Sequence, residues 1–442
     1  MKCIEEEILF EVPKGWEWCR LNSISENVTD GDHQPPPQTV MGIPFLVISN
    51  VSDGYINFND TRYVSVEYYQ ALSNYRKVQS GDLLFTVTGS YGIPIPIEKN
   101  QPFCVQRHIA IIRPCEIAHQ FLCIVLGSEY IKKQCDELST GTAQKTVALS
   151  TLRNFLIPIP SINEQALIIE NTKQLLSLIS DIQINKEQLI DTVNVTKSKI
   201  LSLAIRGKLV PQNSTDEPAS ALLERIRAEK EKLIKEGKIK RDKMESFIYK
   251  GDDNSYYEKI GAKSYCIDNI LPFTIPINWT WCRLSEAFDI IMGASPSCYS
   301  IIDSENGMEF HQGKIFFTER IISKSDKRTI SPSKIATDNS VLLCVRAPVG
   351  EVNITDRKLC IGRGIAAIKP ISEIEILFIY YWLYAFKQNL LSQATGSTFV
   401  AITADVIKLL LIPLPPLQEQ KRIIETIEKC NNHCQVAEKN LI

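Results

Sequence analysis

With 442 residues, of which 44% are apolar, the chain is long enough for two or three domains that each bury a core. Its formal net charge of −2 argues weakly against a dedicated nucleic-acid binder, although a basic face can be balanced by acidic surface elsewhere. No apolar run suits a signal peptide or a membrane span, and the 13 cysteines form no CxxC pair. We therefore expect a cytoplasmic protein with reduced thiols.

The first elements along the chain are short apolar runs rich in β-branched residues, at 45–48, 83–87 and 109–112. Gly, Asp and Pro separate these runs, a pattern that predicts strands. Residues 117–138 then show apolar positions three and four apart, which predicts a helix interrupted at most by Gly127. The first 160 residues are thus expected to form a mixed α/β domain.

After residue 161 the apolar period changes to seven, which predicts a coiled-coil helix over 162–205 that is roughly 65 Å long. Ser161 is a suitable N-cap for this helix. The alternative is a core helix packed on its own domain, but the stripe is too long for one domain. One seam consists of Ile168, Leu175, Ile182, Leu189, Thr196 and Leu203, and a second of Ile179, Val193 and Ile200.

Residues 206–265 are interpreted as a bridge that contains a helix from Ala219 to Lys235. Residues 224–245 carry nine basic and six acidic side chains. Such a charge run is either a solvated face or a docking surface for a partner.

The sequence then repeats itself. A first string recurs at an offset of 263 residues and further strings recur at offsets of 256 and 255. A helix is again predicted, over 373–393. Residues 28–80 and 291–336, by contrast, share nothing that can be aligned, so one scaffold is expected to present two different recognition surfaces. The matching pairs are Trp16-Glu17-Trp18-Cys19-Arg20-Leu21 with Trp279-Thr280-Trp281-Cys282-Arg283-Leu284, the string 104–110 with 360–366, Thr140-Gly141-Thr142 with Thr395-Gly396-Ser397, and 157–165 with 412–420.

Paired domains that open on Pro-x-x-Trp-x-Trp-x-Arg-Leu and close on Ile-Pro-x-Pro-x-x-x-Glu-Gln before a long helix resemble the specificity subunits of type I restriction–modification enzymes. The resemblance implies an α+β fold in which two target-recognition domains flank an antiparallel coiled-coil arm. It divides the chain into domain 1 (1–160), a helical spacer and linker (161–265), domain 2 (266–415) and a short distal helix (416–442). The distal seam is Ile423, Ile427, Cys430, Cys434, Ala437 and Leu441.

The same resemblance implies that each domain reads one half of a split double-stranded DNA target. It implies two methylation subunits as partners, and restriction subunits beside them. S-adenosylmethionine, ATP and Mg are expected on those partners, with no cofactor on this chain. Residue 442 corresponds to 187, so we expect either an asymmetric arm or a shortened reading frame.

The sequence offers no catalytic signature. It lacks both the Asn/Asp-Pro-Pro-aromatic motif of methyltransferases and the GxxxxGK[ST] loop of nucleotide hydrolases. The string 362–367 imitates a dinucleotide fingerprint but is not followed by a helix, and His433 between two seam cysteines is a poor zinc site. A recognition subunit without catalytic or metal-binding residues is expected.

Candidate DNA contacts are polar and cationic side chains in the shared loops and in the divergent inserts. Arg107 and Arg363 occupy equivalent positions, where each can meet a phosphate or pair internally. The Thr-Gly-Thr/Ser loops are either phosphate contacts or tight turns, and the doubled tryptophans are expected in the cores. The candidates are Arg62, Tyr63, Arg76, Lys77, Arg107, Thr142, Gln144, Lys145, Lys314, Arg320, Lys327, Arg328, Arg363, Ser397 and Thr398, with Lys324 and Lys334 as further basic residues of the second insert.

Two other functions fit the same organisation. One is a stand-alone DNA-binding regulator or decoy of the same build. The other is a coiled-coil scaffold whose two domains bind protein or small-molecule ligands. Steep loss of DNA affinity with salt would separate either DNA reader from a scaffold.

Overall fold

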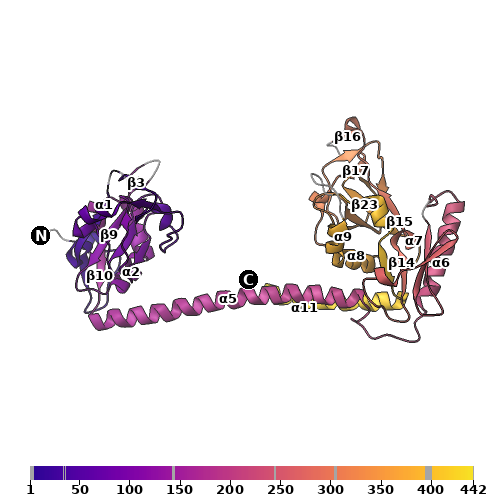
Figure 1. Cartoon of the computed structure of the whole chain (residues 1–442), viewed down its shortest axis with the longest axis horizontal. Helices are drawn as coiled ribbons and strands as arrows, with labels where there is room; N and C mark the ends of the chain where they lie inside the picture. The colour runs from indigo at the N-terminus through magenta and orange to yellow at the C-terminus, as the bar shows by residue number, and fades with distance from the viewer. Residues whose placement is uncertain are drawn as a thin grey trace. The chain divides into compact units, whose positions relative to one another are not determined.

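The computed structural model describes residues 4–32, 34, 36–141, 145–242, 245–302, 306–393 and 401–441. The chain divides into two compact units, Met1–Ile184 and Asn185–Ile442, and each contains one copy of the repeat (Figure 1). The long helix α5 (Ile162–Ile205) contributes its first half to the first unit and its second half to the second.

The first repeat contains a two-stranded pair β1-β10, a four-stranded sheet β2-β9-β6-β7 and another four-stranded sheet β3-β5-β4-β8. Its strands are β1 (Glu17–Arg20), β2 (Ser25–Asp30), β3 (Gln38–Thr39), β4 (Ile43–Leu46), β5 (Arg62–Val64), β6 (Leu83–Thr86), β7 (Pro94–Pro96), β8 (Cys104–Val105), β9 (Ile109–Pro114) and β10 (Leu156–Ile159). Its helices are α1 (Val66–Ala71), α2 (His119–Leu126), α3 (Glu129–Leu138) and α4 (Leu149–Arg153).

The second unit contains a pair β14-β24, a sheet β15-β23-β20-β21, a sheet β16-β18-β17-β22-β19 and a separate sheet β11-β12-β13. Its strands are β11 (Ser246–Lys250), β12 (Tyr256–Ile260), β13 (Lys263–Cys266), β14 (Thr280–Arg283), β15 (Phe288–Met292), β16 (Ile301–Ile302), β17 (Met308–His311), β18 (Arg328–Thr329), β19 (Ile335–Ala336), β20 (Ser340–Cys344), β21 (Val352–Thr355), β22 (Leu359–Ile361), β23 (Ile365–Pro370) and β24 (Leu411–Leu414). Its helices are α6 (Ala219–Lys235), α7 (Leu284–Ala287), α8 (Ile376–Ala385), α9 (Lys387–Gln393), α10 (Ala404–Lys408) and α11 (Leu417–Lys439).

The two repeats match strand for strand, except that the second insert sheet has one additional strand, β19. We call β2-β9-β6-β7 and β15-β23-β20-β21 the frame sheets, and β3-β5-β4-β8 and β16-β18-β17-β22-β19 the insert sheets. The inserts, which cannot be aligned as sequences, still share the order of four strands, β3-β5-β4-β8 and β16-β18-β17-β22. In each, a parallel pair places a Phe opposite a Cys: Phe45 faces Cys104 and Phe310 faces Cys360. The prediction of two copies of one mixed α/β domain is confirmed.

The opening and closing motifs of each repeat are paired strands. In the first repeat Trp18 lies opposite Pro158, and in the second Trp281 lies opposite Pro413. Trp279 and Trp281 are fully buried, as expected, while Trp16 and Trp18 are half-buried. Trp18 packs instead against the rings of Phe10 and Tyr130.

The central strands of the frame sheets are buried on both faces, which explains why β6, β9, β20 and β23 are largely apolar runs. On β6, Leu83 and Phe85 pack into the core with the helices, while Leu84 packs into a separate core with the insert. On β20, Val341 and Leu343 face one core and Leu342 the other. The insert sheet is thus held against a rigid scaffold by apolar contacts.

The predicted helix at 117–138 is two helices, α2 and α3. They break at Gly127, and the side chain of Ser128 caps α3 by accepting a hydrogen bond from the amide of Ile131. The helix expected at 373–393 is likewise divided at Phe386 into α8 and α9. Local capping overrides the apolar period in the first case.

Helix α5 has the predicted bounds, and α11 runs antiparallel to its C-terminal part (Figure 1). Lys197 of α5 forms an ion pair with Glu438 of α11 at 2.8 Å. Gln212, in the segment that follows α5, donates a hydrogen bond to Glu419 of α11 at 2.5 Å. The buried side chains of α5 here are Leu201, Ala204 and Ile205, which pack with Ile423 and Ile427 of α11 and with the core of the second repeat.

The predicted bridge is an integral layer of the second unit. Helix α6 has its predicted bounds, and its residues Ala219, Leu222 and Ile226 are buried in the same core as Trp279. Strands β11 to β13, which the sequence analysis had placed in a linker, form an antiparallel sheet whose Ile248 packs against Trp281.

Candidate nucleic-acid interface

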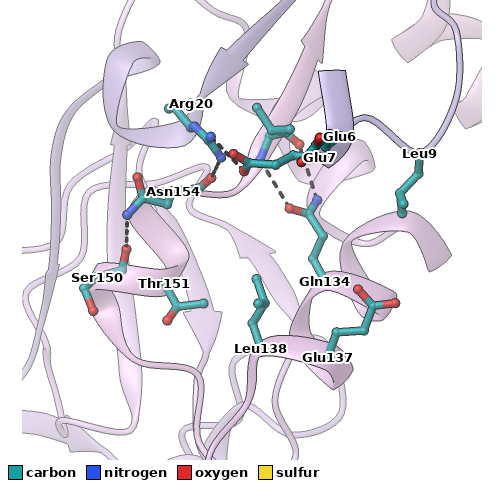
Figure 2. A pocket seen from close by; sticks show the side chains of 11 residues that line it. Glu6, Glu7, Leu9, Arg20, Gln134, Glu137, Leu138, Ser150, Thr151 and Asn154 are labelled. Atoms are coloured by element: carbon teal, nitrogen blue, oxygen red, sulfur yellow. Dashed lines mark hydrogen bonds and ion pairs between the residues drawn. The ribbon is translucent and has the colours of Figure 1, made fainter. Parts of the chain in front are cut away.

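The motif arginines, Arg20 and Arg283, are structural. Arg20 donates to the carboxylate of Glu7 at 2.8 Å and to the backbone carbonyl of Asn154 at 2.6 Å (Figure 2). Arg283 repeats this arrangement with the carboxylate of Glu258 at 2.7 Å and the carbonyl of Leu409. Each guanidinium therefore ties the opening strand to the turn before the closing strand.

A pocket of about 440 Å³ surrounds Arg20 in the first unit. Three carboxylates line it, those of Glu6, Glu7 and Glu137, against the single cation of Arg20 (Figure 2). Because Glu7 already compensates that cation, the pocket is net acidic and repels phosphates. It is not suited to a nucleic-acid backbone.

A second hollow, of about 490 Å³, is lined by one cation, Arg107, and one carboxylate, that of the buried Asp30. The exposed Arg107 and its neighbour His108 line it, on the loop between β8 and β9. Thr88 and Thr146 face each other across it, with their hydroxyl oxygens 3.4 Å apart. Thr140 and Thr146 exchange backbone hydrogen bonds of 2.9 and 2.8 Å, and Thr146 lines the hollow together with Arg107.

Burial, followed by the charge of Arg107, lowers the pKa of His108 below its ordinary value of 6.5. The imidazole is therefore neutral at neutral pH and offers one donor and one acceptor. Arg107 supplies the positive charge of the hollow, while His108 supplies hydrogen-bonding groups suited to a base edge.

The second repeat builds the same loop around Arg363, which is also exposed. The amide of Val345 donates to the carbonyl of Gly364 at 2.9 Å, as Val87 does to His108 at 3.0 Å. Gly364 takes the place of His108, so the two loops share backbone geometry and an arginine but differ in the side chain beside it.

Arg346 is an exposed cation that the sequence analysis missed. Its backbone forms an isolated antiparallel β-bridge with Ala401, and Thr88 forms the equivalent bridge with Thr146 in the first repeat. A signal was available: 83–88 and 341–346 align at an offset of 258, which places Arg346 opposite Thr88. The second repeat thus carries an additional arginine at the position equivalent to the first hollow.

Two glycines hold the arginine loops close to the frame. A Cβ on Gly31 would lie 1.7 Å from the carbonyl oxygen of Val105, and one on Gly293 would lie 2.1 Å from that of Gly362. Both neighbours are backbone atoms that cannot rotate away. Glycine is required at these positions because the loop packs directly on the end of β2 or β15.

In the first insert, Arg62 and Tyr63 lie on β5, with Arg62 exposed and Tyr63 half-buried. Arg76 forms an ion pair with Asp32, which also accepts from the hydroxyl of Tyr68. Lys77 donates to the carbonyl of Gln70 at 2.8 Å and lies over the ring of Tyr69. Only Arg62 of the three cations lacks an internal partner within the described residues.

In the second insert, Lys327 is exposed between β17 and β18, as is Lys324. Lys314 is exposed and lies 3.9 Å from Glu351. Arg328 donates to the carbonyl of Gly307 at 3.1 Å, and Arg320 contacts Glu428 and Tyr381. The exposed Lys334 lies at the edge of this insert.

Lys145 is exposed, and its carbonyl accepts from the amide of Gly89 at 3.1 Å. Four other candidates, Thr142, Gln144, Ser397 and Thr398, lie outside the described residues. Lys145 precedes Thr146, which lines the hollow with Arg107. Arg76, Lys77, Arg320 and Arg328 are engaged in internal contacts.

A family model described as the type I restriction modification DNA specificity domain matches residues 13–194 and again residues 276–442. Together the two matches span most of the chain and coincide with the two repeats. The chain belongs to this family.

Relatives of this DNA specificity family match along nearly the whole chain. One is a putative type I restriction enzyme MjaX specificity subunit of Methanocaldococcus jannaschii, 28% identical over 97% of this chain and 90% of the relative. Another is the EcoAI specificity subunit of Escherichia coli, 25% identical over 97% of this chain and 80% of the relative.

The fold has a counterpart among solved structures of the same family. The HsdS subunit of Thermoanaerobacter tengcongensis superposes with a TM-score of 0.63 and 22% identity, over 99% of this chain and 94% of that subunit. Among the described residues of this DNA specificity protein, no helix is long and apolar enough to cross a membrane. That same part of the chain gathers no cluster of three His, Cys, Asp or Glu side chains that could hold a metal ion.

Proposed function

We propose that this chain is the DNA-recognition subunit of a type I restriction–modification complex, and that each repeat reads one half of a split target. One observation carries the proposal. The two copies of a DNA specificity domain present an exposed arginine, Arg107 or Arg363, at the same loop beside insert sheets of different sequence. A shared anchor with divergent neighbours suits two half-sites of different sequence.

The anchor arginines suit phosphate or guanine, since a guanidinium binds either in a bidentate manner. The cations best placed to meet DNA are those that have no ion-pair partner within the described part of the chain. Among them we favour the exposed Arg62, Arg107 and Lys145 in the first unit, and the exposed Lys327, Arg346 and Arg363 in the second. We assign Tyr63, His108 and Lys314 as further candidates at the rims of these surfaces.

The chain is proposed to recognise DNA without catalysing a reaction or holding a cofactor. Two methylation subunits with S-adenosylmethionine, as the family resemblance implies, and restriction subunits with ATP and Mg would supply the chemistry. An uncovered apolar face on the first half of α5 supports a protein partner there, because contiguous exposed apolar patches mark interaction sites. Its residues Leu175, Leu176, Leu178, Ile179 and Ile182 are each 56–61% exposed.

The decisive experiment is to co-purify this chain with the methylation subunit encoded in the same genome and to sequence the methylated bases of host DNA. Methylation at a split motif that disappears on deletion of this gene establishes the role. A salt-sensitive DNA affinity without partner or mark would instead indicate a stand-alone DNA binder. If the chain forms no complex, causes no methylation and has no affinity for DNA, it is a scaffold.

A further inference from the structure

The insert of the second repeat is fastened to the arm. Its segment 318–321 lies between the frame sheet and α11, where Arg320 donates to the carboxylate of Glu428 at 2.8 Å and to the hydroxyl of Tyr381 at 3.2 Å. Tyr381 also donates to Glu428. One cation from the insert, one hydroxyl from α8 and one carboxylate from the arm thus form a closed triangle.

Neighbouring contacts reinforce this triangle. The hydroxyl of Tyr380 donates to the carbonyl of Glu319 at 2.8 Å, and Gln435 of α11 donates to the Glu319 carboxylate at 3.0 Å. On the opposite side, the amide of Ile354 donates to the carbonyl of Arg320 at 2.8 Å, which continues the frame sheet. We call this set of contacts the staple: residues 319, 320, 380, 381, 428 and 435.

The staple differs from an ordinary surface ion pair. Both charged side chains are partly buried, 39% exposed for Arg320 and 30% for Glu428, and each has a second partner. An isolated exposed pair contributes little, whereas a network of partly buried partners fixes geometry. The staple therefore restrains the rotation of the second repeat about its own part of the arm.

The described positions of the first repeat that correspond to Glu428, Tyr380 and Tyr381 carry residues that cannot make these contacts. At an offset of 255 the counterpart of Glu428 is Lys173, which is exposed. At an offset of 257, which aligns α8 with α2, Tyr380 and Tyr381 correspond to Cys123 and Ile124. The restraint thus joins two insert residues, Glu319 and Arg320, to side chains of α8 and α11 that differ from their counterparts in the first repeat.

We propose that Arg320 is a positioning residue that holds the second repeat at one rotation on the arm, and that this restraint sets which spacing between half-sites is accepted. The inference rests on the proposed function. One added base pair moves a half-site by about 3.4 Å and turns it by about 34–36°. A repeat held at one rotation rejects that change, while a repeat free to turn tolerates it.

The test measures methylation by the complex with its methylation subunits, on the split target at its native spacing and with one base pair added or removed. For Arg320→Gln, Glu428→Gln and the double variant, we expect the preference for native spacing to fall by roughly fivefold to tenfold. The double variant should lose no more than either single variant, because the two residues act through one contact. Glu425→Gln, an exposed glutamate on the same helix, should retain the wild-type preference.

Three results would overturn the inference in distinguishable ways. An unchanged spacing preference in both single variants, with thermal stability retained, removes the positioning role alone. Loss of methylation at all spacings in Arg320→Gln, with Glu428→Gln unaffected, makes Arg320 a direct DNA contact. A wild-type complex that marks no split site overturns the proposed function and this inference with it.

Discussion

Gln165 and Gln420 make the same two hydrogen bonds, 255 residues apart. Gln165 accepts from the amide of Ala118 at 3.1 Å and donates to the carbonyl of Pro160 at 3.2 Å, and it is buried. Gln420 does the same with Glu375 at 2.9 Å and Pro415 at 3.0 Å. The glutamine of the closing motif therefore anchors the arm helix to the start of α2 in the first repeat and of α8 in the second.

Gln165→Ala should destabilise the first unit, because it leaves a buried amide and a buried carbonyl unpaired. At about 1–3 kcal/mol for each such group, we expect the free energy of unfolding to fall by roughly 2–4 kcal/mol. Thermal unfolding checks this, with Gln174→Ala on the exposed part of α5 as the matched control, for which a change within about 0.5 kcal/mol is expected. Equal effects of the two variants would contradict the anchoring role.

Gly293→Ala should displace the loop that carries Arg363. The new methyl carbon would lie 2.1 Å from the carbonyl oxygen of Gly362 and 2.6 Å from that of Ile365. We expect a loss of about 1–3 kcal/mol in stability, as for overpacked cores, together with weaker methylation of the split target. Gly313→Ala is the stability control, since a Cβ there meets open space. A wild-type melting temperature for Gly293→Ala would refute the steric argument.

The repeat and the bounds of α5 and α6 were predictable because they depend on strings that recur or on the local apolar period. The shared topology of the inserts was not predictable. Phe45 and Phe310 occupy the same place in their sheets, but their neighbours differ, and strand pairing depends on backbone hydrogen bonds that leave no common residue pattern. Strands β11 to β13 were missed because a charged segment precedes them and their apolar residues face Trp281 from only one side.

The candidate site was predictable in part. Arg107 and Arg363 could be found because the repeat aligns them, but exposure alone does not separate Arg62 from Arg76. Asp32, which neutralises Arg76, lies 44 residues away in sequence and is brought near only by the fold. Tertiary ion pairs of this kind decide which cations remain available to DNA.

Removing the charge at Arg107 or Arg363 should change the salt dependence of DNA binding. If each arginine contacts one phosphate, the slope of log affinity against log salt falls by about 0.9 for each substitution to alanine. If it reads a base instead, the slope is nearly kept and about 1–3 kcal/mol of discrimination is lost at one position of one half-site. Binding titrations of the complex at several salt concentrations distinguish the two contacts.

Lys133→Ala is the matched control for these titrations, since Lys133 is exposed on α3, the helix that contributes Glu137 to the acidic pocket. Its slope should equal that of the wild-type complex. A control slope that falls as far as that of Arg107→Ala would show only a general effect of net charge.

The buried pair of Glu258 and Arg283 should make the second unit sensitive to acid. Hydrogen bonding to Arg283 holds the pKa of Glu258 below its ordinary value of 4.5. A carboxyl with a depressed pKa stabilises the fold at all pH values above 4.5, and this contribution is lost as the pH falls from there through the lower folded pKa. Glu286 and Glu419 act in the opposite direction, because burial raises the pKa of each.

Comparison with Glu258→Gln isolates the one carboxyl from the others. At pH 7 the variant should lose roughly 2–4 kcal/mol, since Arg283 is left buried without its counter-charge. As the pH falls below 4.5, the stability curves of the wild type and the variant should converge, because protonation removes the same charge from the wild type. Glu224→Gln on the exposed side of α6 should run parallel to the wild type throughout. Denaturant titrations at a series of pH values measure all three curves, and a constant gap between wild type and Glu258→Gln would show that the pair does not titrate with folding.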